Sequence, residues 1–104
     1  MAIKDVLREE LERSLQMQKD YDRELAKLPR GSLVRRLIKG HVYFYLVYRE
    51  DGKVRTEYRG QASKEEIEKY RHAKERRAIY RGSIAKLKKQ IRFLKGTLRG
   101  KEPI

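Results

Sequence analysis

The most strand-like segment of the chain reads His41-Val42-Tyr43-Phe44-Tyr45-Leu46-Val47-Tyr48. β-Branched and aromatic residues dominate it, as is typical of strands. The dipeptide Lys39-Gly40 before it is a turn signal, and Asp51-Gly52 after it is among the strongest short hairpin signals. We therefore predict that this segment is the middle strand of a three-stranded antiparallel meander over residues 32–60.

The predicted middle strand is apolar on both of its faces. Alternate residues of a strand share a face, so the two sets are Tyr43, Tyr45 and Val47 on one side and Val42, Phe44, Leu46 and Tyr48 on the other. A strand of this kind is covered on both sides. We expect helices to pack on one face and a second copy of the chain or a ligand to meet the other.

Helical patterns flank the predicted sheet. Residues 1–28 place leucines at heptad spacing until Pro29, which disfavours helical geometry in the residue before it. Residues 63–98 begin with Ser63 and Glu66, a capping-box pattern, and continue with apolar residues three and four positions apart. The predicted fold class is α+β: a long helix, a three-stranded antiparallel β-meander and a second long helix. We expect one domain over residues 1–104, the helices paired as an antiparallel coiled-coil hairpin, and a flexible tail at 99–104.

The second predicted helix is longer than the first. Its apolar positions from Ile84 to Leu98 keep a heptad spacing, and we expect the first helix to cover them only in part. An uncovered apolar row of this kind favours self-association. The chain is therefore predicted to form a homodimer through this row.

The charge of the chain is strongly positive and unevenly distributed. Lys and Arg number 28 against 15 Asp and Glu, for a formal charge of +13. Residues 1–28 have six basic and seven acidic side chains, for a charge of −1. Residues 29–62 have eight basic and three acidic side chains, for a charge of +5, and residues 63–104 have fourteen basic and five acidic side chains, for a charge of +9. Such asymmetry is typical of proteins that bind nucleic acid or membrane surfaces.

Basic side chains of the last two segments are the candidate binding residues, because lysine and arginine neutralise phosphates and release counterions. The second helix carries Lys86, Lys88, Lys89, Arg92, Lys95, Arg99 and Lys101 with no acidic residue before Glu102. The predicted phosphate contacts are Arg49, Lys53, Arg55 and Arg59 from the sheet and Arg77, Arg81, Lys86, Lys89, Arg92 and Lys95 from the helix.

Each of these groups has a plainer interpretation. The basic helix residues could form the solvated face of a coiled coil, although such faces usually mix charges of both signs. For the sheet, the functional interpretations are entry into the major groove or stacking of its tyrosines on single-stranded bases. The plainer interpretation is that the tyrosines belong to the core.

Other classes of function have little support in the sequence. The chain has no cysteine, and His41 and His72 have no partner at metal-ligand spacing, so we expect no metal site. We find no nucleophile motif or glycine-rich phosphate loop, and predict no catalysis, no cofactor and no small-molecule substrate. The first residues are charged, and no apolar run is long enough to cross a bilayer; the absence of cysteine fits a reducing, cytoplasmic setting. A helix bound to a membrane surface is a third interpretation, but the apolar stripe fits a heptad and lacks tryptophan anchors, so we expect no membrane partner.

The residues from Gly40 to Arg55, with Tyr58 and the Ser63–Glu68 helix start, resemble the arm-type DNA-binding domain that precedes the catalytic domain of phage integrases. That family has an aromatic strand ending in Tyr-Arg, a Gly-Lys-x-Arg hairpin, a short third strand and a helix that begins with Lys-Glu-Glu. The resemblance covers about residues 40–68 and implies groove contacts by Arg49, Lys53, Arg55 and Arg59. The helix of this chain is much longer than that of the family. The same segment is also similar to short uncharacterised prokaryotic proteins, which imply no activity.

Together these observations predict a non-catalytic nucleic-acid-binding accessory protein, with DNA favoured over RNA. The alternative is a structural or adaptor protein whose coiled coil and sheet face associate with an acidic protein partner. Nucleic acid that copurifies with the chain would distinguish the two.

Overall fold

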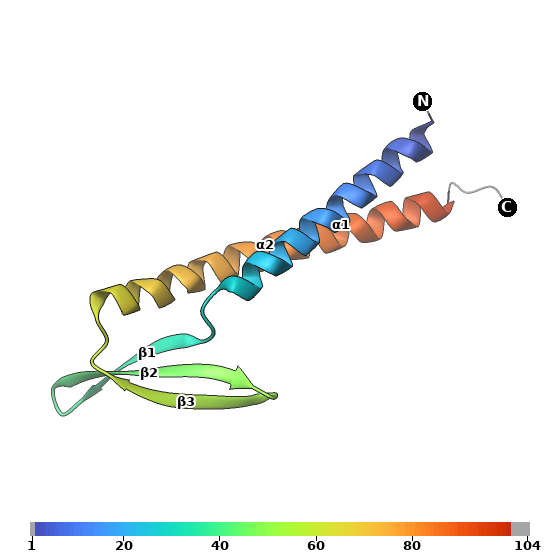
Figure 1. Ribbon diagram of the computed structural model, residues 1–104. Coiled ribbons are helices and arrows are strands. Elements are labelled where there is room, and N and C mark those ends of the chain that lie inside the picture. The colour runs from blue at the N-terminus through green and yellow to red at the C-terminus, as the bar shows by residue number, and fades with distance from the viewer. Residues whose placement is uncertain (1, 101–104) are drawn as a thin grey trace. The chain divides into compact units, whose positions relative to one another are not determined.

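The computed structural model describes residues 2–100 and contains five elements (Figure 1). They are α1 (Ile3–Lys27), β1 (Ser32–Ile38), β2 (His41–Glu50), β3 (Lys53–Gly60) and α2 (Lys64–Gly100). This is the predicted helix, meander and helix. The chain forms two compact units, one joining α1 to α2 from Ala78 onward and the other comprising Leu28–Arg77.

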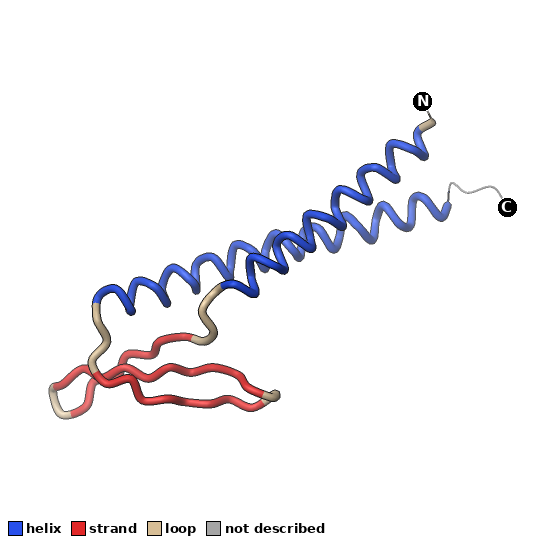
Figure 2. The backbone as a smooth tube through the Cα atoms, in the orientation of Figure 1, coloured by secondary structure: helices blue, strands red, loops and turns tan. Residues whose placement is uncertain are grey.

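The sheet is an antiparallel meander in the order β1-β2-β3, with β2 in the middle as predicted. Figure 2 shows its two hairpin turns at opposite ends of the strands. Both residues of each turn have positive φ, 51° and 80° at Lys39-Gly40 and 52° and 76° at Asp51-Gly52. Two-residue turns of this type match the twist of the strands that they join, and they favour Asp-Gly sequences. Local sequence thus sets both hairpins.

The two faces of the sheet differ in burial. Leu46 of β2, paired with Leu33 and Glu57, is the one strand residue that is fully buried among the described residues. We call the side that carries Leu46 the inner face. The start of α2 belongs to the same compact unit and buries Ala73 to 1% exposure, and its Glu66 lies 3.8 Å from Arg59 of β3. The opposite side, which carries Tyr43, Tyr45, Val47 and their cross-strand partners, is the outer face.

The connection between α1 and β1 depends on one glycine. Gly31 has a φ of +93°, which L side chains rarely adopt, and a Cβ added there would lie 2.7 Å from the carbonyl oxygen of Val47. The backbone of this loop therefore approaches β2 more closely than any residue with a side chain would allow.

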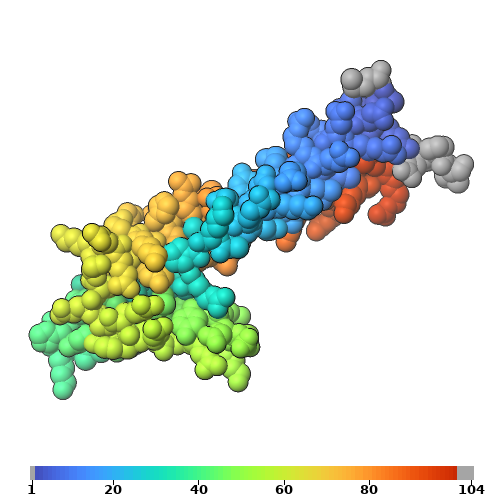
Figure 3. Space-filling view, in the orientation of Figure 1, coloured from blue at the N-terminus to red at the C-terminus, as the bar shows by residue number. Residues whose placement is uncertain are grey.

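The helices pack antiparallel in their own unit, as predicted. Figure 3 shows α1 in blue against the orange and red part of α2. The rings of Tyr21 and Tyr80 have centroids 5.8 Å apart, and Gln90 donates a 3.0 Å hydrogen bond to the hydroxyl of Ser14, which is 2% exposed. These two pairs set the register, in which α1 lies beside α2 from about residue 78 to its end.

That register overturns the expectation that the apolar row of the second helix lacks cover. Its members are at most 8% exposed: Ile84, Leu87, Ile91, Leu94 and Leu98. The part of α2 that extends beyond α1 is its first part, which belongs to the sheet unit, rather than its last. The homodimer predicted from this row therefore loses the surface on which it was based.

The ends of α2 follow the predicted signals in part. The backbone NH of Glu66 donates to the Ser63 hydroxyl at 3.1 Å, which confirms the N-cap. The carboxylate of Glu66 does not complete the capping box but lies beside Arg59. The helix includes Arg99 and Gly100, so the tail predicted from residue 99 is wrong at these two positions. Its remainder, 101–104, lies outside the described residues.

Candidate nucleic-acid interface

Five basic side chains lie on one face of the second half of α2, and we call them the cationic stripe. They are Arg81, Lys88, Arg92, Lys95 and Arg99. Their successive spacings are seven, four, three and four residues, which at 3.6 residues per turn keeps them within about one sixth of the helix circumference. The apolar row occupies a different part of the circumference, so that the stripe faces solvent while the row faces α1.

No acid neutralises the cationic stripe within the described part of the chain. All five side chains are exposed, and none of the ion pairs found over residues 2–100 involves them. The sequence has no acidic residue between Glu75 and Glu102. Unpaired lysine and arginine side chains that share one surface can neutralise phosphates and release their counterions.

The basic residues of α1 are arranged differently. Arg13, Arg23 and Lys27 lie 2.9, 3.4 and 3.0 Å from carboxylate oxygens one turn earlier in the same helix. At the start of α2, Arg71 likewise donates hydrogen bonds to Glu68 and Glu75. The bond from Arg71 lowers the pKa of the Glu68 carboxyl below its ordinary value. These basic side chains contribute to the net charge of the chain, but each is already paired with a carboxylate.

Only some of the predicted helix contacts belong to the cationic stripe. Arg81, Arg92 and Lys95 are members of it. Lys86 lies about a third of a turn from Arg92, and Lys89 lies between them. Lys88 and Arg99 belong to the basic segment of the second helix but were not among the predicted phosphate contacts. Their heptad spacing from Arg81, Arg92 and Lys95 is the signal that would have found them.

Arg77 is turned into the protein rather than toward solvent. Its guanidinium donates a 2.8 Å hydrogen bond to the carbonyl oxygen of Pro29 and lies 3.5 Å from that of Gly31. The side chain is half-buried. Its place at the connection between α1 and β1 makes Arg77 a structural residue, whereas the sequence had suggested a phosphate contact.

Replacing Arg77 with methionine is expected to lower the free energy of unfolding by about 1.5–3 kcal/mol, because hydrogen bonds from a charged donor to the loop carbonyls are lost. Urea denaturation measures the change. The matched control is Arg76→Met, since Arg76 is exposed and has no hydrogen-bonded or ion-paired partner among residues 2–100. Equal unfolding midpoints for the two variants would show that Arg77 does not hold the loop.

The four predicted sheet contacts do not share one face. Lys53, Arg55 and Arg59 alternate with the outer-face residues of β3 and so belong to the inner side of this edge strand, whereas Arg49 lies on the outer face. Arg59 is also near two acids, 3.8 Å from both Glu57 and Glu66. The register shift beside Tyr45 leaves Arg59 without a partner on β2. The structure therefore does not gather these four side chains into one surface.

The outer face carries a basic residue that was not among the predicted contacts. Arg36 of β1 is exposed, and its guanidinium carbon lies 5.9 Å from the centroid of the Tyr45 ring. Alternation along β1 places it on the same side as Val34 and Ile38. The strand register, which the sequence alone does not supply, is what joins Arg36 to Tyr45.

Comparison with known families gives one match. Residues 4–69 match the model of a family described as a domain of unknown function, DUF6788. The match covers more than half of the chain. This chain belongs to DUF6788. Searches of curated proteins and of solved structures find no match.

The matched part of this DUF6788 protein contains α1, the sheet and the start of α2. The cationic stripe lies beyond the matched residues. Over residues 2–100, the DUF6788 chain has no group of three or more histidine or acidic side chains placed to hold a metal ion. Among these residues, no helix is both long enough and apolar enough to span a bilayer.

Proposed function

We propose that this DUF6788 protein is a non-catalytic nucleic-acid-binding accessory protein that holds the phosphate backbone through the cationic stripe of α2. One observation carries the proposal: five exposed cations share a helix face with no acidic partner among the described residues. Each contact with a phosphate releases condensed counterions, so affinity comes mainly from entropy and depends steeply on salt. Binding of this kind is largely independent of the nucleotide sequence.

DNA is favoured over RNA by the similarity of residues 40–68 to the arm-type domain of integrases. In that interpretation the sheet adds contacts from Arg49, Lys53, Arg55 and Arg59, and Arg49 is the member on the outer face. We give these residues a secondary part, because they divide between two faces and Arg59 is near two acids. Lys86 and Lys89 flank the cationic stripe and extend its positive field.

The rival function is that of an adaptor whose positive charge is complementary to an acidic protein partner. The chain has seven tyrosines and no tryptophan, so its own ultraviolet absorption is weak and bound nucleic acid is conspicuous. The protein is purified at low salt, and one half is treated with nuclease and washed with high salt. We expect nucleic acid in the untreated half alone, and a shift of labelled duplex by the treated half. A treated protein that shifts neither labelled duplex nor labelled single strand at low salt would overturn the proposal.

A further inference from the structure

The outer face of the sheet combines aromatic rings with positive charge and carries no acidic side chain. The acids of the strands, Glu50 and Glu57, lie on the inner side by alternation, and Asp51 is in the turn. The cations of the outer face are Arg36 and Arg49, both exposed. Its charge is therefore complementary to a polyanion.

Three tyrosines from two strands form a continuous group on this face. The ring centroid of Tyr58 lies 5.3 Å from that of Tyr45 and 6.2 Å from that of Tyr43. His41 continues the row, with its ring 6.4 Å from Tyr43. Tyr58 is 58% exposed, far more than a core tyrosine. The rings pack against each other yet leave aromatic surface open to solvent.

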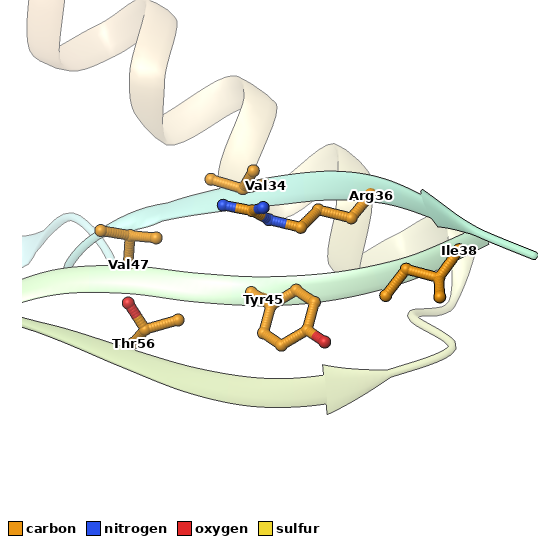
Figure 4. A pocket seen from close by; sticks show the side chains of 6 residues that line it. All are labelled: Val34, Arg36, Ile38, Tyr45, Val47 and Thr56. Atoms are coloured by element: carbon orange, nitrogen blue, oxygen red, sulfur yellow. The ribbon is translucent and has the colours of Figure 1, made fainter.

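A hollow of about 320 Å³ adjoins one ring of this group, that of Tyr45 (Figure 4). It is lined by Val34, Arg36, Ile38, Tyr45, Val47 and Thr56. Its volume is at the lower end of the range of small-ligand sites, about 300–1,000 Å³. Apolar walls, one aromatic ring and one guanidinium are suited to a planar base with a phosphate beside it.

We propose that the outer face binds single-stranded nucleic acid, with bases stacked on Tyr45 and Tyr58 and phosphates held by Arg36 and Arg49. The inference rests on the proposed function and adds the strandedness of the ligand. Bases of a duplex stack on each other and leave no ring face for a side chain, whereas single-stranded bases stack on aromatic residues. An acidic peptide would match the charge but would not use the tyrosine rings.

The test measures binding of a fluorescent oligodeoxythymidine of about 12 nucleotides, within the site sizes of about 4–16 known for single-strand binders. The Tyr58→Ala variant is expected to lose about 5- to 150-fold in affinity, the usual effect of removing an aromatic side chain on which one base stacks. Tyr58→Phe keeps the ring and is expected to bind like the wild type. Phe93→Ala removes an aromatic side chain of α2 that is 69% exposed, and is expected to change nothing.

Further measurements separate the alternatives. Arg36→Gln is expected to weaken single-strand binding without removing a ring, and circular dichroism checks that each variant is folded. Equal oligonucleotide affinity of the wild type, Tyr58→Ala and Arg36→Gln would overturn the inference, even where duplex binding persists. A change in sedimentation of Tyr58→Ala with unaltered affinity would assign the face to a second copy and also overturn it. Failure of the wild type to bind either strand form would overturn the proposed function itself.

Discussion

Replacing Lys88, Arg92 and Lys95 together with glutamine is expected to weaken duplex DNA binding by about two to three orders of magnitude at about 0.1 M salt. The estimate follows from counterion release, in which each phosphate contact adds about 0.9 to the slope of log affinity against log salt. Relative to 1 M salt, each contact then contributes about eightfold at 0.1 M. Glutamine is a good helix former, so α2 is expected to keep its structure. Fluorescence anisotropy with a labelled duplex measures the loss.

The matched control removes the same charge from paired positions. Arg13, Arg23 and Lys27 lie beside acids of α1, and their replacement with glutamine lowers the net charge of the chain equally. This second triple variant is expected to lose much less affinity, because its cations are already neutralised locally. Equal losses in the two triple variants would mean that net charge alone attracts DNA and that the cationic stripe has no special part.

Truncation of Ile91 to alanine is expected to lower the free energy of unfolding by about 2–5 kcal/mol. Ile91 is 7% exposed and stands in the middle of the apolar row that packs against α1. The lost stability combines the transfer free energy of the removed methyl and methylene groups with the cost of the cavity that they leave. Because small domains are stable by only about 5–15 kcal/mol, this one change removes a large share.

Thermal and urea unfolding of the Ile91→Ala variant measure this effect, with Phe93→Ala as the control two residues away. Phe93 is 69% exposed, and its loss is expected to change stability by less than about 0.5 kcal/mol. Similar effects of the two substitutions would contradict the helix pairing that the Tyr21–Tyr80 and Ser14–Gln90 contacts define.

Local sequence was sufficient for the elements themselves. Lys39-Gly40 and Asp51-Gly52 favour two-residue turns, whose residues have positive φ, and the β-branched and aromatic residues between them favour the one long strand that is found. Ser63 marks the start of α2 because its hydroxyl caps a free backbone NH. Such signals act over a few residues and require no knowledge of tertiary structure.

The pairing of the elements could not be predicted in the same way. Heptad spacing indicates that two helices pack but not their register, so α1 was expected to cover the apolar row of α2 only in part, whereas every member of that row is buried. The partner of Arg77 is distant in sequence, at Pro29, and Glu66 approaches Arg59 from the helix that follows the strand, so helix and strand periodicity reveals neither contact. Charge alone therefore overstated the role of these two arginines.

The contact between the cationic stripe and phosphate is tested most directly by the salt dependence of duplex binding. If all five side chains neutralise phosphates, the slope of log affinity against log salt is expected to be about −4.5 for the wild type. For the triple variant of Lys88, Arg92 and Lys95 it is expected to fall to about −1.8. Binding by the wild type that does not change with salt, or the same slope in both proteins, would contradict the proposal.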